Sequence, residues 1–145
     1  MKTNTSIIFI LSLLIQPVFA NDCTTTPNRT TGTHYKPVTV EKINLGEGIT
    51  VKGQILSAVD CKPIANAKIA RWQGGENGRY EDRFYAYMFA DEQGRYEYET
   101  EWPNMPSPHI HFIVAADGFK TVETQWIGSE RQTLIEFDIV LEKDS

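Results

Sequence analysis

Cysteine is scarce in this 145-residue sequence, which contains only Cys23 and Cys61. Because no Cys-x-x-Cys or Cys-x-x-His spacing occurs, a structural zinc site of the usual kind is not expected. The sequence also has no cluster of five or more basic residues, and its 19 acidic residues outnumber its 14 basic ones. Nucleic acid and anionic membranes are therefore poor candidate partners.

Long apolar runs are also missing, apart from one near the start. A positive start at residues 1–2 is followed by an apolar run at 7–15 and then by small residues up to Ala20. This order is typical of a secretory signal peptide, and the run is too short to span a bilayer comfortably. We expect residues 1–20 to be a signal peptide cleaved near Ala20. The mature protein would then be secreted or periplasmic, without stable membrane insertion, and an uncleaved anchor helix is the alternative.

The two cysteines lie on either side of the first expected strand. In an oxidising compartment such a pair predicts one disulfide, Cys23–Cys61, although two unpaired thiols remain possible. The bond would tie an N-terminal extension, residues 21–45, to the loop after that strand. Residues 21–37 are rich in Thr, Asn and Pro, which is typical of an extended arm or a flexible leader.

Residues 46–145 show the pattern of one all-β domain. Apolar and polar side chains alternate over short segments that are separated by turn residues, and no segment has a convincing helical period. The row Glu97, Glu99 and Glu101 is best interpreted as the solvated face of one strand. About seven strands favour an antiparallel β-sandwich. They are expected near residues 49–55, 67–72, 84–90, 96–100, 109–115, 121–126 and 134–141.

His109 and His111 are the sharpest chemical feature of the sequence. Residues two apart in a strand point to the same face, so both imidazoles could reach one metal ion, while Ile110 would point to the core. Two partly exposed histidines in an ordinary strand are the alternative.

Tyr80 follows the glycine-containing segment 72–79, which can turn tightly and deliver one side chain to a defined place. A lone tyrosine in a loop is more often a packing residue. A tyrosine combined with two histidines favours a ferric ion, because a bound cation holds the phenol deprotonated far below its free pKa of about 10.

Several motifs occur in a fixed order between Gly46 and Leu141. They are Gly46-Glu47 through Val51-x-Gly53-x-Ile55, Pro63-Ile64-x-x-Ala67-x-Ile69 leading to Trp72-Gln73 and Gly78-Arg79-Tyr80, Asp91-Glu92-Gln93-Gly94-x-Tyr96, Pro108-His109-Ile110-His111-Phe112, Thr124-Gln125 and Phe137-Asp138-Ile139-Val140-Leu141. In these motifs the sequence resembles the intradiol ring-cleavage dioxygenases, which include the catechol, protocatechuate and hydroxyquinol enzymes. The resemblance covers nearly the whole expected domain and implies an intradiol dioxygenase-like core.

The resemblance also implies a cofactor, substrates and site residues. Members of the family hold Fe(3+) with two tyrosines and two histidines, and they open small aromatic diols with O2. Carried over residue by residue, the metal ligands are Tyr80, His109 and His111, and Gln125 is the catalytic residue that would orient the intermediate. The resemblance leaves the oligomeric state open.

Two family residues have no counterpart in this sequence. The second tyrosine belongs in the proline-rich stretch 102–107, where Met105 or its neighbours stand instead. The active-site arginine, which usually just precedes the histidines, is replaced around residues 106–107. These changes remove a base and an electrostatic stabiliser. Candidate replacement ligands, each more ordinarily a packing or surface residue, are His34, Tyr35, Tyr85 and Tyr87.

The sequence therefore supports two hypotheses. The first is an exported non-haem Fe(III) intradiol dioxygenase acting on catechol-type rings. The second is a non-catalytic metal- or ligand-binding β-sandwich that has lost ring-cleavage activity.

Overall fold

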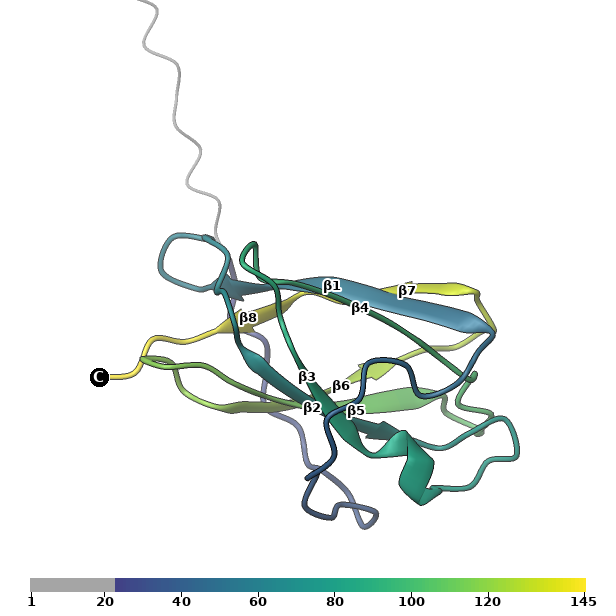
Figure 1. Ribbon diagram of the computed structural model, residues 1–145. Coiled ribbons are helices and arrows are strands. Elements are labelled where there is room, and N and C mark those ends of the chain that lie inside the picture. The colour runs from purple at the N-terminus through teal and green to yellow at the C-terminus, as the bar shows by residue number, and fades with distance from the viewer. Residues whose placement is uncertain (1–22) are drawn as a thin grey trace, which may run out of the picture.

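Alternating burial along each strand builds two four-stranded sheets that pack face to face (Figure 1). The computed structural model describes residues 23–145, so the expected signal peptide lies outside the described residues. A single turn of 3-10 helix, η1, spans Asp82–Phe84. Within the described range, no helix is long and apolar enough to cross a membrane. The strands are β1 Ile49–Ser57, β2 Lys68–Gln73, β3 Ala86–Phe89, β4 Arg95–Thr100, β5 His109–Ala115, β6 Val122–Ile127, β7 Leu134–Glu136 and β8 Ile139–Leu141.

The first sheet is built around β1. On one side β1 pairs antiparallel with β4, and on the other it pairs in parallel with β7 and then with β8. The expectation of one strand over residues 134–141 was therefore wrong, because the chain breaks at Phe137 and Asp138. The carbonyl of Phe137 approaches Gly53 so closely that an added Cβ would lie 2.0 Å from it. The Asp138 carboxylate accepts a hydrogen bond from the Gln54 amide. Residues 137 and 138 therefore lie between two short strands, β7 and β8.

The second sheet has the order β3-β2-β5-β6 and is antiparallel throughout. Its register places Trp72 on β2 opposite His111 on β5, and His111 opposite Gln125 on β6. The expected antiparallel β-sandwich is confirmed, with the parallel pairing of β7 and β8 as the departure within the first sheet.

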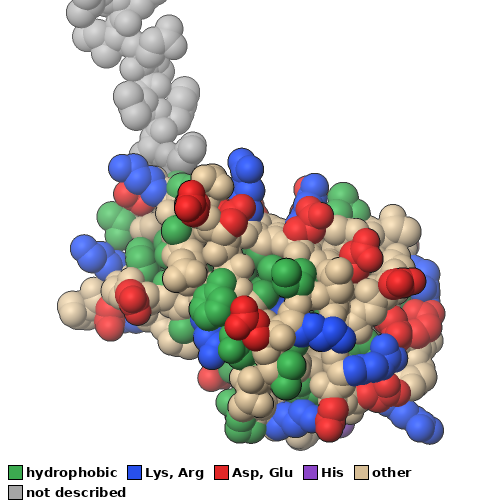
Figure 2. Space-filling model, viewed as in Figure 1, with side chains coloured by type: hydrophobic (Ala, Val, Ile, Leu, Met, Phe, Trp, Pro, Cys, Tyr) green, Lys and Arg blue, Asp and Glu red, His purple; other side chains and the backbone are tan. Residues whose placement is uncertain are grey.

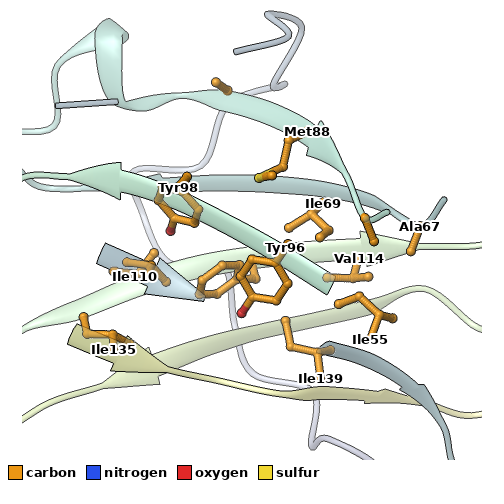
Figure 3. Packing of buried hydrophobic residues seen from close by; sticks show 14 of the residues in the cluster. Ile55, Ala67, Ile69, Met88, Tyr96, Tyr98, Ile110, Val114, Ile135 and Ile139 are labelled. Carbon is orange, nitrogen blue, oxygen red and sulfur yellow. The ribbon is translucent and has the colours of Figure 1, made fainter. Parts of the chain in front are cut away.

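The core lies between the inner faces of the two sheets (Figure 3). Strand β5 contributes Ile110, Phe112 and Val114, all fully buried, as the alternation in the sequence predicts. Strand β4 contributes Tyr96 and Tyr98 from the opposite sheet. Burying an aliphatic side chain of this size stabilises the fold by roughly 1.5–3 kcal/mol, so the inner face of β5 anchors the strand that carries both histidines.

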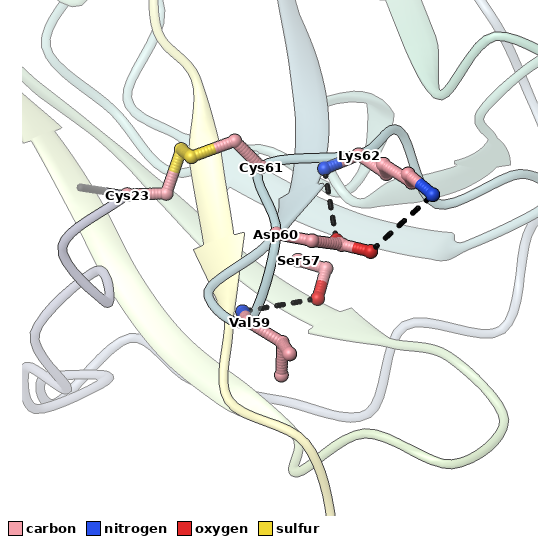
Figure 4. Close-up of a disulfide and its surroundings, with 6 residues drawn as sticks. All are labelled: Cys23, Ser57, Val59, Asp60, Cys61 and Lys62. Carbon is pink, nitrogen blue, oxygen red and sulfur yellow. Dashed lines mark hydrogen bonds and ion pairs between the residues drawn. A yellow bond between two sulfur atoms is a disulfide. The ribbon is translucent and has the colours of Figure 1, made fainter. Parts of the chain in front are cut away.

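The N-terminal arm, residues 23–45, lies against the sandwich. Cys23 is bonded to Cys61 in the turn after β1 (Figure 4). Thr26 then exchanges hydrogen bonds with Val140 of β8. Further along, the arm passes the middle strands of the second sheet, where Tyr35 meets Trp72 edge to face, and reaches β3 at Tyr87. Of the two possibilities left open by composition, the structure shows the extended arm.

Candidate metal centre

His109 and His111 lie on the outer face of the second sheet, at the start of β5. The alternation that places Ile110 in the core points both imidazoles away from it. His109 is half-buried, and His111 is only 5% exposed. The ring of His111 stacks on the indole of Trp72, with centroids 4.9 Å apart, so the neighbouring strand fixes its orientation.

A braced loop between β2 and η1 delivers Tyr80. The Gly75 amide donates to the Arg79 carbonyl, and the Gly78 amide donates back to Gly75. Gly78 has φ +71°, in the left-handed region that favours glycine. The carboxylate of Glu101, just after β4, accepts hydrogen bonds from the Glu76 amide and from a side chain of η1. The loop is therefore fixed both by backbone hydrogen bonds within it and by the Glu101 carboxylate outside it.

The structure brings Tyr80, His109 and His111 together at their polar tips. The Tyr80 hydroxyl lies 2.8 Å from Nε2 of His109 and 3.4 Å from Nε2 of His111. The Nδ1 of His109 is 2.7 Å from the Ser107 carbonyl. Nδ1 must carry a proton there because a carbonyl can only accept. In the neutral imidazole Nε2 then offers a lone pair to which the Tyr80 hydroxyl can donate.

The donor set fits a metal ion. Ligand atoms about 2.1 Å from a common cation, at angles from square to tetrahedral, lie roughly 3.0–3.4 Å apart, close to the two distances in the site. The Nδ1 of His111 is buried without a hydrogen-bond partner among the described residues. A ligated Nε2 would leave the proton of His111 on that nitrogen. Within residues 23–145, no three His, Cys, Asp or Glu residues converge on a cation position, so the site depends on the tyrosine.

Burial sets the protonation of this cluster. It lowers the pKa of His111 to about 4, with further lowering by His109 and His34. Burial, together with the nearby Tyr85, raises the pKa of Tyr80 to about 12. At neutral pH His111 is therefore neutral and able to ligate, while Tyr80 is a phenol unless a cation displaces its proton.

These residues line a pocket of ≈270 Å³. Gln125 borders it from β6, next to His111, as the resemblance implies. Met105 also borders it, from the proline-rich loop where the family carries its second tyrosine. No Lys, Arg, Asp or Glu is among the lining residues. The lining is Thr30, Gly32, Thr33, His34, Tyr80, Met105, His109, His111 and Gln125.

A larger depression of ≈600 Å³ lies over β1 and β4, but it is lined mainly by charged side chains and contains neither histidine. Its lining offers no convergent set of Tyr and His donors. We therefore place the candidate centre in the smaller pocket. On the face shown in Figure 2, acidic and basic side chains are interspersed.

The sequence indicated His34 only as a possible replacement ligand and missed the contribution of the rest of the arm to this pocket. Thr30, Gly32 and Thr33 line it, and His34 stacks face to face on Tyr80 with centroids 4.1 Å apart. The disulfide expectation was the other indication that the arm lies against the sandwich. The other replacement candidates are not pocket-lining: Tyr35 contacts Trp72, Tyr87 pairs within the second sheet, and Tyr85 binds the His34 carbonyl through its hydroxyl.

Known proteins share this architecture. The dioxygenase domain of a dioxygenase–carbohydrate-binding fusion from a Streptomyces species superposes with a TM-score of 0.74, covering 83% of this chain and all of that domain, at 22% identity. Hydroxyquinol 1,2-dioxygenase from Pseudomonas putida gives a TM-score of 0.70 over 83% of this chain and 67% of its own, at 14% identity. An intradiol ring-cleavage dioxygenase from Tetranychus urticae gives 0.63 over 71% and 64%, at 23% identity.

Sequence comparison gives a more distant match. Hydroxyquinol 1,2-dioxygenase from Rhodococcus opacus is 26% identical over a region covering 54% of this chain. The chain spans 35% of that relative's length. No family model matches the sequence. The fold is that of the intradiol ring-cleavage dioxygenases, and the resemblance stated from the motifs is confirmed at this level.

Proposed function

We propose that this protein binds a ferric ion through Tyr80, His109 and His111 and acts as an intradiol-type dioxygenase on a small aromatic diol with O2. The observation that carries the proposal is the convergence of one phenol oxygen and two imidazole nitrogens, at 2.8 and 3.4 Å, in a pocket bordered by Gln125. The names of the structural neighbours and of the Rhodococcus relative support the choice of chemistry.

Four residues of the pocket have a specific role in this proposal. A bound ferric ion would supply the activation of a chelated diol toward O2. Tyr80 would give up its proton and offer a phenolate, while the Ser107 carbonyl keeps the Nε2 lone pair of His109 directed into the pocket. The amide of Gln125, which borders the pocket opposite His111 in the register, would orient the intermediate by hydrogen-bonding an oxygen of the diol. Met105 would contribute an apolar side chain to the border of the pocket.

A non-catalytic binding module on the same scaffold is the alternative. It is favoured by Met105, which lines the pocket where the family has a tyrosine able to take a substrate proton, and by the absence of Lys and Arg from the lining. Losing a base and a positive charge of this kind removes factors that each contribute about two or more orders of magnitude in rate. Such a protein would bind iron or an iron–diol complex without turning it over.

The proposal includes export to an oxidising compartment. The Cys23–Cys61 bond supports it, because disulfides persist in secreted and periplasmic proteins and are rare in the cytosol. The apolar run at residues 7–15 is the sequence feature that would direct export.

The test is oxygen consumption and ring-opened product from catechol and hydroxyquinol, with iron content measured on the same samples. Wild-type protein with one iron per chain should turn over, and His109→Ala should lose both iron and turnover. Ser107→Ala is the matched control, since it keeps the backbone carbonyl that orients His109. If iron binds at full stoichiometry but neither diol gives a product, the dioxygenase hypothesis is rejected in favour of the non-catalytic binding module.

A further inference from the structure

The N-terminal arm crosses the candidate centre between two fixed points. Before the crossing, the Arg29 amide donates to the Glu123 carbonyl at 2.7 Å, and the Glu123 amide donates to the Asn28 side chain at 3.0 Å. After it, the Tyr85 hydroxyl donates to the His34 carbonyl at 2.6 Å. We call residues 30–34, which lie between these points, the strap. Four of its five residues line the pocket.

The strap contacts the proposed ligands directly. The His34 imidazole lies over the Tyr80 ring at 4.1 Å, with the two planes 8° apart. Gly32, with φ +73°, approaches His111 so that an added Cβ would be 3.7 Å from Cε1. The low exposure of His111 is consistent with this cover. The strap is thus one wall of the pocket, and the sandwich provides the others.

The dimensions and chemistry of this wall limit what can enter. A volume of ≈270 Å³ lies just below the range of ~300–1,000 Å³ that is usual for ligand pockets. The lining holds no Lys or Arg, so a carboxylate on the ligand would lose hydration without gaining a charged partner from these side chains. Because the strap forms one wall, a single ring held at the polar tips of Tyr80 and the histidines would pack beside the stacked rings of His34 and Tyr80. A second fused ring would need additional space on the side that the strap closes.

We propose that the strap is the specificity wall of this pocket and restricts its ligands to single-ring diols without a charged substituent, with His34 as the determining residue. The selectivity rests on the proposed function, because it concerns diols held at the same site. The wall itself depends only on the arrangement of the arm and is tested without metal.

Selectivity is tested by calorimetric binding of three diols to iron-loaded protein: catechol, 3,4-dihydroxybenzoate and 2,3-dihydroxynaphthalene. Wild type should bind catechol at least about tenfold more tightly than either of the others. His34→Ala should bring the affinity for the naphthalene diol to within about threefold of that for catechol, and His34→Phe, which keeps a stacking ring, should preserve the discrimination. Thr39→Ala, on the arm outside this pocket, is the matched control. Equal affinities for the three diols in wild type, or unchanged selectivity in His34→Ala, would overturn the inference.

The wall is tested on metal-free protein by hydrogen–deuterium exchange at Cε1 of His111, read by mass spectrometry. Tyr85→Phe removes the hydroxyl that fastens the strap at His34 but keeps the ring. It should speed His111 exchange at least about threefold through local opening, while Thr39→Ala leaves the rate unchanged. An unchanged His111 exchange rate in Tyr85→Phe would contradict the claim that the strap covers this side of the pocket. Faster exchange together with failure of every diol to bind iron-loaded protein would instead reject the proposed function and the selectivity built on it.

Discussion

At the scale of single residues, two histidines on one strand are held in different ways. His109 is oriented by a hydrogen bond to the Ser107 carbonyl, while His111 is oriented by stacking on Trp72. The hydrogen bond fixes a proton on Nδ1 of His109, whereas the stacking contact fixes only the plane of the His111 ring. In the proposed site, His109 would therefore present a fixed tautomer to the ion, whereas His111 would acquire its tautomer from whatever its Nε2 binds.

Gly53 is the residue on which the layout of the first sheet depends most directly. A Cβ at this position would lie 2.0 Å from the Phe137 carbonyl oxygen, which belongs to the backbone and has little room to move. Gly53→Ala should therefore lower the free energy of unfolding by about 2 kcal/mol or more, measured by urea denaturation. Thr50→Ala, on the same strand, is the control. A loss equal to that of the control would show that the close approach does not constrain the fold.

At the scale of elements, the loop between β2 and η1 determines where Tyr80 lies. A Cβ on Gly75 would come within 2.4 Å of the Phe84 ring, so Gly75→Ala should displace the loop without removing any ligand. Because metal ligands must be held within about 0.5 Å of their productive positions, iron affinity should fall at least about tenfold in a chelator competition. Glu92→Ala, in a turn away from the pocket, should match wild type, and unimpaired affinity in Gly75→Ala would contradict this role of the loop.

Glu101 braces the same loop through charge. Hydrogen bonds from the Arg83 guanidinium and the Glu76 amide lower the pKa of its carboxyl group. A lowered folded-state pKa contributes stability above the ordinary value near 4.5, and that stability is lost as pH falls through the folded value. Glu101→Gln should therefore lower the free energy of unfolding at pH 7 by under ~1 kcal/mol, since the pair is near the surface.

Urea denaturation at two pH values tests this assignment. The difference between Glu101→Gln and wild type should shrink as the pH is lowered below the ordinary carboxyl pKa near 4.5, because the Glu101 carboxyl then gains its proton and both side chains become uncharged. Glu97→Gln, on the outer face of β4, is the matched control because its side chain is exposed and solvated. A deficit for Glu101→Gln that persists unchanged in acid would mean that packing, rather than charge, explains it.

The elements were largely predictable from sequence, because alternation and turn residues are local signals. The segments carrying β1 to β6 were each found this way, with ends that agree to within two residues. The break between β7 and β8 was not, since it depends on a carbonyl of residue 137 meeting Gly53, far away in the sequence. The glutamate row was correctly interpreted for Glu97 and Glu99. Glu101 differs because its partners come from another loop.

At the scale of the whole molecule, the disulfide joins the arm to the sandwich over a separation of 38 residues. Closing a loop of that length restricts the unfolded chain by an amount equivalent to about 4 kcal/mol in the chain-entropy account. The double variant Cys23→Ala, Cys61→Ala should lose up to this amount in urea denaturation. Its arm should also show faster amide exchange at residues 24–30. Unfolding at the wild-type midpoint would contradict a stabilising role for the bond.

The candidate site was predictable only in part, for a reason that applies to the molecule as a whole. Tyr80, His109, His111 and Gln125 lie in or beside the core strands, where local pattern and family order place them. The strap comes from a segment whose composition, rich in Thr, Asn and Pro, indicates neither a strand nor a contact. Its position follows from the disulfide and from pairs of hydrogen bonds to Glu123 of β6 and to Val140 of β8. Pattern analysis does not detect such long-range contacts.

The central claim is that Tyr80 and the two histidines form one ferric site, and the visible absorption spectrum of iron-loaded protein tests it most directly. Wild type should bind one ferric ion per chain and show a tyrosinate-to-iron charge-transfer band. Tyr80→Phe should lose that band, whereas Tyr87→Phe, which removes a hydroxyl outside the pocket, should retain it. A colourless wild-type protein after ferric reconstitution, or a band of undiminished intensity in Tyr80→Phe, would contradict the claim.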